Sequence, residues 1–182
     1  EQQHFVNARK HDSQDICFVP DGDYVGFMER YTGKYYPDGD FLDVNGKVVG
    51  RHHGAVRYTC GQRKGLGIGG RRESLFILAT DTAQNVIYVG EGDNHPGLYR
   101  RALRIAPGEL HWIDPLRELK TGESRRFDVR IRYRQPLQGA ELFIRPDAAY
   151  LLFDEPQRGI TPGQFAAWYD GDELVGSGVI AE

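Results

Sequence analysis

The residue best able to do covalent chemistry in this sequence is Cys17. It lies in the segment Asp12-Ser13-Gln14-Asp15-Ile16-Cys17-Phe18, where a polar stretch leads into a short apolar run, and the turn signal Pro20-Asp21-Gly22 follows. This pattern predicts a thiol on a short strand or turn beside a loop. Such a thiol is reactive if a cation or a helix N-terminus lowers its pKa. Otherwise it packs as a small hydrophobic side chain, as most free cysteines do.

A second candidate is a cluster of basic residues in the C-terminal half. Its members are Arg125, Arg126, Arg130, Arg132 and Arg134. If the segment is one extended strand, the last four side chains point to the same face. A row of like charges is costly unless it is solvated or faces a polyanion. The cluster is therefore either an RNA-facing surface or an ordinary exposed face with ion pairs to acidic residues such as Glu123, Asp128 or Glu141.

Two other polar segments could form sites. The glycine-rich segment 61–70 carries Arg63 and Lys64 but lacks the spacing of a phosphate-binding loop. We expect a tight loop that exposes this basic pair, either to an RNA backbone or to solvent. His52 and His53 are adjacent, but no third ligand at zinc spacing accompanies them, so we predict no metal site.

The composition is that of a globular protein able to bury a core. The chain has 182 residues, 40% of them hydrophobic, and a formal net charge of -3, which counts only weakly against RNA binding. No apolar run approaches the ~20 residues of a membrane span, and no signal segment opens the chain. Two distant cysteines favour a reducing, cytoplasmic location. The chain begins at Glu1 without methionine, which indicates a piece of a longer protein.

Turn signals and residue alternation predict strands after one short helix. Residues 23–31 carry apolar residues at helical spacing, with Asp23 as the N-cap and Gly33 as the residue that ends the helix. We interpret the aromatic residues of this helix as core packing rather than as a base-stacking platform. Asn45-Gly46 between two apolar runs predicts a hairpin with a primed turn. We expect strands at 41–44, 47–49, 57–59, 74–80, 85–89, 98–105, 109–112, 125–133, 139–144, 149–153, 164–169 and 173–180.

The even spacing of the later strands favours a small closed barrel over an open sheet. We therefore predict a mainly β fold, with a small central β domain, a C-terminal six-stranded β-barrel and a short N-terminal helical connector. The expected boundaries are 1–32 for the connector and cysteine segment, 33–97 for the central domain and 98–182 for the barrel.

Four ordered segments resemble those of one known family. Asp12–Phe18 is similar to its D-S-x-x-I-C-F segment, and Thr59–Ile68 to its T-x-G-Q-R-K-G-L-G-I segment. Arg132-Tyr133-Arg134-Gln135 follows, and then Phe153–Pro156 with Thr161–Gln164. The family is that of the bacterial tRNA-specific 2-thiouridylases, whose members are often labelled tRNA methyltransferases. Because the four segments span nearly the whole chain in the right order, chance similarity does not explain them.

The resemblance implies part of an ATP-dependent tRNA sulfurtransferase. Members of the family replace the 2-oxo group of the wobble uridine with sulfur carried as a cysteine persulfide, a reversible oxidation state of a thiol. Cys17 matches the persulfide carrier, while Arg132, Tyr133 and Gln164 match residues that bind tRNA. A guanidinium fork, an aromatic face and an amide suit phosphates and single-stranded loops. The implied partners are tRNA and a sulfur-relay protein, with no membrane and no DNA.

The resemblance covers only the part of the family that follows its catalytic domain. No S-G-G-x-D-S nucleotide motif is present, and no cysteine matches the family's first, nucleophilic cysteine. We interpret Cys60 as a packing residue. We therefore expect no cofactor in this chain, ATP with Mg in an N-terminal PP-loop domain, and no activity of this part alone. The alternative is a non-catalytic β-barrel RNA-binding module related to the enzyme by descent.

Overall fold

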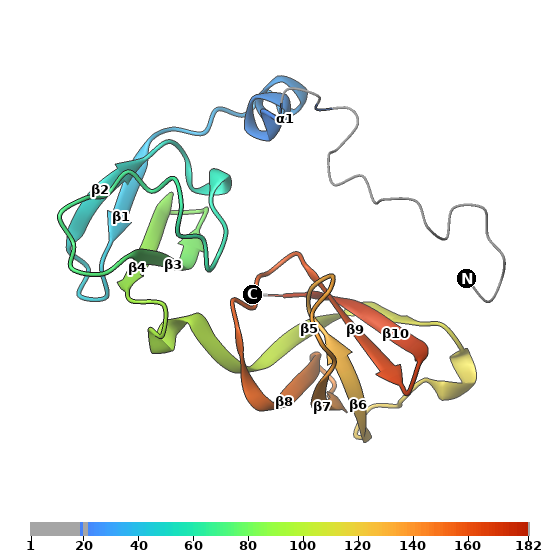
Figure 1. Ribbon diagram of the computed structural model, residues 1–182. Coiled ribbons are helices and arrows are strands. Elements are labelled where there is room, and N and C mark those ends of the chain that lie inside the picture. The colour runs from blue at the N-terminus through green and yellow to red at the C-terminus, as the bar shows by residue number, and fades with distance from the viewer. Residues whose placement is uncertain (1–18, 20–21, 182) are drawn as a thin grey trace, which may run out of the picture. The chain divides into compact units, whose positions relative to one another are not determined.

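The computed structural model describes Val19 and residues 22–181, and these residues are mainly β (Figure 1). The segment around Cys17 lies outside the described residues, so its predicted conformation is not addressed. The chain divides into two compact units, residues 1–37 and 38–182. The first unit holds the helix, and the second holds a four-stranded sheet and a barrel. The prediction of a mainly β fold with one short helix near the N-terminus is confirmed.

The helix α1 spans Tyr24–Thr32 and is capped as the sequence predicts. The Asp23 carboxylate accepts a hydrogen bond from the Gly26 N–H at 3.0 Å, which satisfies a free donor of the first turn. Gly33 ends the helix with a φ of 67°, and its N–H donates to the Glu29 carbonyl. The aromatic stripe does not pack as a core, however, because Tyr31 is 82% exposed.

The central sheet has the strand order β2-β1-β4-β3. Its strands are β1 (Gly39–Leu42), β2 (Val48–His52), β3 (Leu75–Asp81) and β4 (Val86–Glu91). Only the β1–β4 pair is parallel. The sheet packs on one side around Phe41, Ile77 and Ile87, which are fully buried.

Two local predictions for this sheet need correction. The hairpin around Asn45 and Gly46 forms, but only Gly46 has a positive φ, whereas a primed turn of type I′ requires one at both residues. The Asp43 carboxylate accepts from the Asn45 and Lys47 N–H groups, which stabilises a longer loop instead. The strand expected at 57–59 is wrong, because the chain there makes the 3-10 turn Ala55–Arg57.

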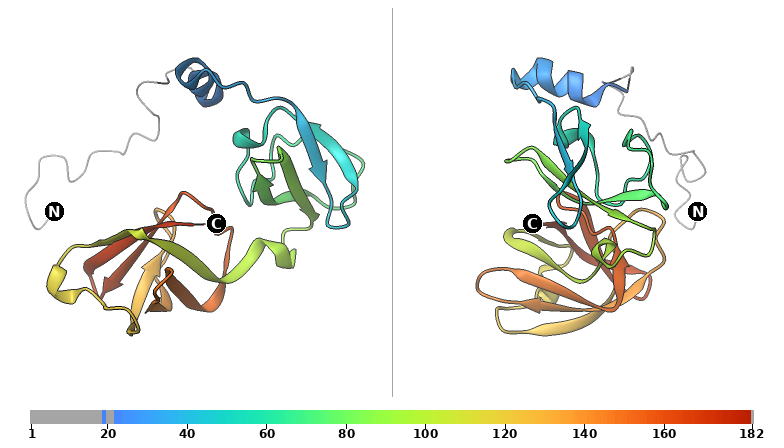
Figure 2. Two further views of the ribbon diagram at one scale, coloured as in Figure 1. Left: turned by 180° about the vertical axis from the view of Figure 1, so that it is seen from behind. Right: turned by 90° about the vertical axis from the view of Figure 1, so that its left-hand side faces the viewer.

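The barrel closes with the order β10-β5-β8-β7-β6-β9, and every neighbouring pair is antiparallel (Figure 2). Its strands are β5 (Tyr99–Trp112), β6 (Ser124–Arg130), β7 (Gln138–Ile144), β8 (Ala149–Arg158), β9 (Phe165–Asp170) and β10 (Glu173–Ile180). Closure removes the free sheet edges that would otherwise pair with other chains. The six-stranded barrel predicted from the strand spacing is confirmed, although the segments 98–105 and 109–112 form the single strand β5.

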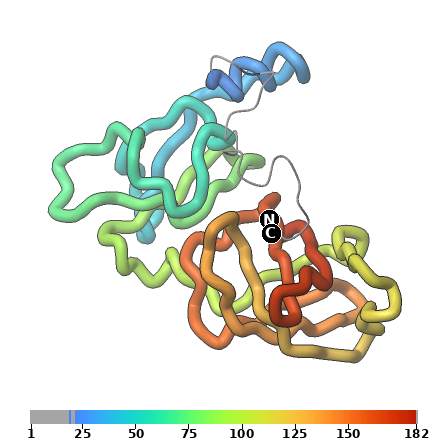
Figure 3. The backbone as a smooth tube through the Cα atoms, turned by 45° about the vertical axis from the view of Figure 1, so that its right-hand side comes forward, coloured from blue at the N-terminus to red at the C-terminus, as the bar shows by residue number. Residues whose placement is uncertain are grey.

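Alternation along β9 separates the barrel core from its outer surface. Ala166 and Trp168 are fully buried in the core, and the intervening residues Phe165, Ala167 and Tyr169 face outward. β6 runs beside β9 in the barrel (Figure 3). Arg130 is paired with Ala167 in this antiparallel ladder. The outer faces of these two strands therefore form one continuous surface.

Candidate nucleic-acid interface

The arginine cluster does not lie on one strand. β6 ends at Arg130, and the chain turns through Arg132–Gln135, where the Gln135 N–H donates to the Arg132 carbonyl at 3.2 Å. Arg134 has a φ of 65°, in the left-handed region that non-glycine residues seldom adopt. This conformation breaks the extended chain. The prediction that Arg126, Arg130, Arg132 and Arg134 share a strand face is therefore wrong beyond Arg130.

Two hydrogen-bonded glutamines, the half-buried Gln135 and the buried Gln157, support this turn. The Gln135 side-chain oxygen accepts from the Ile131 N–H at 3.1 Å, and its amide nitrogen donates to Gln157 Oε1 at 2.8 Å. Gln157 is only 5% exposed and also donates to the Glu155 carbonyl at 2.9 Å. Sequence reasoning missed Gln157. Its position could have revealed it, because Gln157 is a polar residue that alternates in step with the inward-facing residues of β8. A polar side chain on the inward face needs a hydrogen-bond partner.

Arg132 links the turn to the segment after β8. Its guanidinium donates to the carbonyls of Arg158 and Gly159, at 3.0 Å for the latter. Burial lowers the pKa of Arg132, and the neighbouring charge of Arg158 acts in the same direction. An added Cβ at Gly159 would lie 2.9 Å from the Arg132 guanidinium, so a larger residue there would displace this side chain. Arg132 is thus a structural clamp that also places positive charge at the surface.

The three residues predicted to bind RNA lie around one groove of about 640 Å³. Arg132 and Tyr133 come from the turn after β6, and Gln164 comes from the turn before β9. We call this the barrel groove. Its other lining residues are Arg130, Ile131, Arg134, Phe165, Ala167 and Tyr169. The fold thus brings together two segments about thirty residues apart in the chain.

The barrel groove is basic and aromatic. The guanidinium of Arg130 lies 5.6 Å from the centre of the Tyr169 ring, and that of Arg134 lies 5.3 Å from the centre of the Tyr133 ring. Tyr133 is 72% exposed. An arginine that lies over an aromatic ring is attracted to the ring and keeps its positive charge. The groove can therefore offer cationic groups and flat apolar faces to the same ligand.

A second groove of about 390 Å³ shares Arg132 and Gln164 with the first and is also lined by Thr59–Gln62. These residues begin the glycine-rich segment. The Gly61 N–H donates to the Ile77 carbonyl at 2.8 Å, and the Ile77 N–H donates to the Gln62 carbonyl at 3.0 Å. This start of the loop is therefore anchored to β3.

The rest of the glycine-rich segment is the exposed loop that the sequence predicts. Gly65 and Gly67 have φ values of 80° and 67°, and Arg63 and Lys64 are exposed. Cys60, just before this loop, is half-buried, and its burial raises the pKa of the thiol. A raised thiol pKa disfavours the reactive thiolate and fits a packing role.

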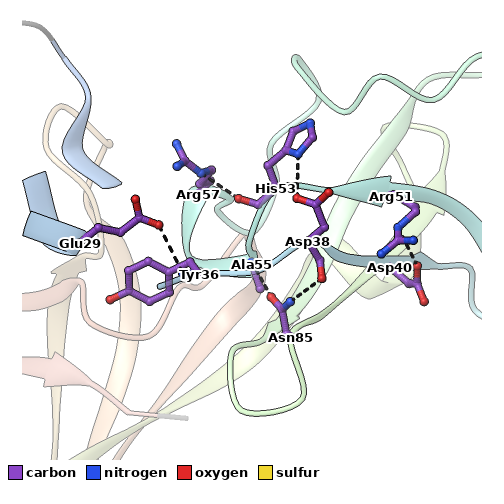
Figure 4. A network of polar contacts seen from close by, with 9 residues as sticks. All are labelled: Glu29, Tyr36, Asp38, Asp40, Arg51, His53, Ala55, Arg57 and Asn85. Carbon is purple, nitrogen blue, oxygen red and sulfur yellow. Dashed lines mark hydrogen bonds and ion pairs between the residues drawn. The ribbon is translucent and has the colours of Figure 1, made fainter. Parts of the chain in front are cut away.

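The adjacent histidines lie in different environments. His52 is fully buried against the rings of Phe41 and Tyr58. His53 is exposed and contacts the Asp38 carboxylate at 2.8 Å (Figure 4). Burial lowers the pKa of His52. The two rings do not converge, and within residues 22–181 no three side chains of the metal-binding types come together.

The Asn85 side chain links the segment that precedes β1 to the segment that follows β2. Its side chain donates to the Asp38 carbonyl at 3.1 Å and accepts from the Ala55 N–H at 3.0 Å (Figure 4). Asn85 has a φ of 55°, a conformation that asparagine tolerates better than most residues. The polar contacts around His53 thus join parts of the central sheet and form no ligand site.

Comparisons with known proteins identify the central sheet and the barrel as two known domains. Residues 25–91 match the family model described as a tRNA methyl transferase PRC-barrel domain, and residues 102–180 match the one described as an aminomethyltransferase beta-barrel domain. The two matches cover the central sheet and the barrel in the same order. They define the class as that of tRNA-modification proteins with paired β domains.

Curated relatives define the family more closely. The tRNA-specific 2-thiouridylase MnmA of Christiangramia forsetii is 41% identical over 99% of this chain and 53% of the relative, and that of Flavobacterium johnsoniae is 53% identical over the same shares. The MnmA of Pseudomonas aeruginosa is 40% identical over 99% of this chain and 47% of the relative. The chain belongs to the tRNA-specific 2-thiouridylase family. It spans about half the length of the curated relatives it matches. No described helix has the length and hydropathy needed to span a bilayer.

Proposed function

We propose that the full-length protein containing this chain is a tRNA-uridine 2-sulfurtransferase that acts on the wobble uridine. In this proposal the chain supplies the persulfide cysteine, Cys17, and part of the tRNA-binding surface. Membership in a family whose relatives are named tRNA-specific 2-thiouridylases supports the activity. The observation that carries the RNA-binding part is the gathering of Arg132, Tyr133 and Gln164 around the barrel groove.

Each groove residue suits a different part of an RNA loop. Arg132 holds the turn through two backbone carbonyls and leaves a positive charge beside the groove. The exposed ring of Tyr133 offers a flat face to an unpaired base. The Gln164 amide can donate to a phosphate or pair with a base edge. Together they can bind a single-stranded RNA segment without reading a double helix.

Cys17 is proposed to carry the sulfur. Its thiolate would take a sulfur atom from the persulfide of a sulfur-relay protein, which leaves as a thiolate. The terminal sulfur of the Cys17 persulfide would then attack C2 of the uridine, and the activated oxygen would leave with the adenylate. A cysteine thiolate of the N-terminal domain would attack Cys17 Sγ, which breaks the S–S bond, forms a disulfide between the two cysteines and releases the thiolated uridine. ATP with Mg is proposed to bind the N-terminal domain of the full-length enzyme and to activate that oxygen. This chain alone is therefore proposed to be inactive, and the enzyme to work in the cytoplasm.

The sulfur role is tested with Cys17→Ser in the full-length enzyme. We expect tRNA binding to persist and thiolation to be abolished, because a hydroxyl cannot form a persulfide. Cys60→Ser is the matched control and should keep both properties, since Cys60 is half-buried with a raised pKa. A Cys17→Ser enzyme that still thiolates tRNA would show that the persulfide role is wrong.

The second candidate is a non-catalytic RNA-binding module. It is favoured by the fact that the barrel groove is formed entirely by residues 130–169 and needs no contribution from Cys17. The coding sequence upstream of Glu1 decides between the two. An in-frame PP-loop domain supports the enzyme, and a start codon adjacent to Glu1 supports the module.

A further inference from the structure

We propose that Phe165 is the principal stacking residue of the barrel groove and that the groove takes an unpaired nucleotide of single-stranded RNA. This inference rests on the proposed tRNA-binding function and deepens it. It adds a residue that the resemblance does not assign, and it specifies the ligand as a nucleotide whose base is free to stack.

Phe165 is an apolar ring that the fold leaves in solvent. It is 61% exposed, although its neighbours in the alternation, Ala166 and Trp168, are fully buried. It directly follows Gln164 and lines the barrel groove with Tyr133 on the other side. An exposed aromatic ring beside other exposed rings and charged groups is typical of a ligand-binding surface.

Phe165 differs from the two tyrosines of the groove. The ring of Tyr169 is covered by Arg130, and that of Tyr133 is covered by Arg134. Within the described residues, no cation or aromatic ring lies over Phe165. Phe165 is therefore the ring in the groove that has neither face taken by an arginine or by another ring.

Space and charge lie on either side of this ring. Ala167 faces outward two residues along β9, and its small side chain leaves the floor of the groove open. Arg130 is paired with Ala167 across the β6–β9 ladder, and its Nε atom has no hydrogen-bond partner among the residues described. A buried donor without an acceptor favours an anionic ligand at this position. A phosphate beside Arg130 would place the attached base toward the aromatic side of the groove.

These features favour single-stranded RNA over other polyanions. An acidic peptide would pair with the arginines but would have no use for exposed rings. A double helix keeps its base faces stacked internally and cannot present one to Phe165. Stacking on aromatic residues beside a basic groove is how proteins bind unpaired nucleotides.

The test uses the full-length enzyme and an eight-nucleotide single-stranded RNA that contains 2-aminopurine, whose fluorescence falls when it stacks. We expect Phe165→Ala to weaken binding of this RNA about tenfold, as for the loss of one stacked base, and to abolish the quenching. Phe165→Trp should restore both properties. Binding of a duplex of the same sequence should not change.

A second variant tests the groove independently. Ala167→Trp fills the floor of the groove from the outer face and should also weaken binding of the octamer. Ala102→Trp is the matched control, because Ala102 is exposed on β5 and lies outside the groove. Equal melting temperatures of both variants would show that any binding loss comes from the groove and not from unfolding.

The outcomes separate this inference from the proposed function. If Arg132→Ala loses tRNA while Phe165→Ala and Ala167→Trp bind tRNA and octamer like the wild type, the RNA-binding function stands and the stacking site is wrong. If polyglutamate competes as well as the octamer, the groove recognises only charge, and the stacking site is again wrong. If none of these variants changes tRNA binding, both the inference and the RNA-binding role of the barrel are overturned.

Discussion

Five arginines on the barrel fall into two sets with different partners. Arg117 donates to Asp170 and, at 2.7 Å, to Glu173, and Arg126 donates to Asp154 at 2.6 Å. Arg132 instead donates to backbone carbonyls, and Arg130 and Arg134 lie over tyrosine rings. In the described part of the chain, no ion pair involves any of these last three.

This contrast shows why a cluster of like charges is a poor guide to a binding surface. Carboxylates on the same barrel already compensate Arg117 and Arg126, so an RNA phosphate would have to displace them. Carbonyls and rings leave the charge of the second set uncompensated. The barrel groove is therefore lined by three arginines that have no ion pair within the described residues.

The largest effect is expected from Gln157→Leu. This change leaves the Gln135 amide without its acceptor beneath the turn and should cost about 1–3 kcal/mol in the free energy of unfolding, as for a buried unsatisfied group. It should also weaken tRNA binding, since the turn carrying Arg132 and Tyr133 loses its support. Urea unfolding and filter binding measure the two effects. Gln84→Leu, at an exposed loop position, should change neither.

The next effect distinguishes the two arginine sets directly. In the full-length enzyme, Arg132→Ala should weaken tRNA binding by about 1–3 kcal/mol, the range for charge-assisted hydrogen bonds, and leave ATP binding intact. The loss should shrink as salt rises, because counterion release contributes to it. Arg117→Ala should bind tRNA like the wild type. Equal losses in the two variants would mean that the division between the sets has no functional meaning.

A smaller effect concerns the central sheet, where His52 is fully buried. Burial lowers the pKa of His52, although the charges of Asp40 and Asp38 oppose this shift. The folded protein therefore binds this proton less readily than the unfolded chain. The contribution of His52 to stability is present above the ordinary histidine pKa and is lost as the pH falls below it.

Urea unfolding at pH 7.5 and 5.5 checks this prediction. The wild type should lose stability at the lower pH, and His52→Leu should lose less. His53→Leu is the control, because His53 is exposed and lies against Asp38. A His52→Leu protein with the full acid-dependent loss would assign that loss to other groups.

The smallest effect is expected from Arg126→Ala. The Arg126–Asp154 pair is exposed, so water screens it and its removal should change neither stability nor tRNA affinity measurably. Thermal unfolding and filter binding check both expectations. A clear loss of tRNA affinity would show that the RNA-binding surface extends along β6 to Arg126. That result would agree with the prediction that the arginines form one face of a strand.

Local sequence signals predicted the elements and the closure of the barrel. Asp23 and Gly33 act within one turn of the helix they bound, and the alternation along β9 follows from the two faces of a strand. The turn at Arg132–Gln135 could not be predicted in this way. It depends on the left-handed backbone of Arg134 and on Gln157, which comes from a strand about twenty residues further along the chain. The resemblance identified Arg132, Tyr133 and Gln164, and the arginine cluster in the sequence included Arg130. Only the barrel topology brings in Phe165 and Tyr169.

The most direct test of the barrel groove as an RNA-binding surface is ultraviolet cross-linking of bound tRNA to the full-length enzyme, followed by mapping of the modified peptides. We expect cross-links to Tyr133 and Phe165 that disappear when excess unlabelled tRNA competes. Peptides that carry Arg117 and Arg126 should stay unmodified. Cross-links confined to those peptides, with none at Tyr133 or Phe165, would contradict the assignment of the barrel groove to RNA.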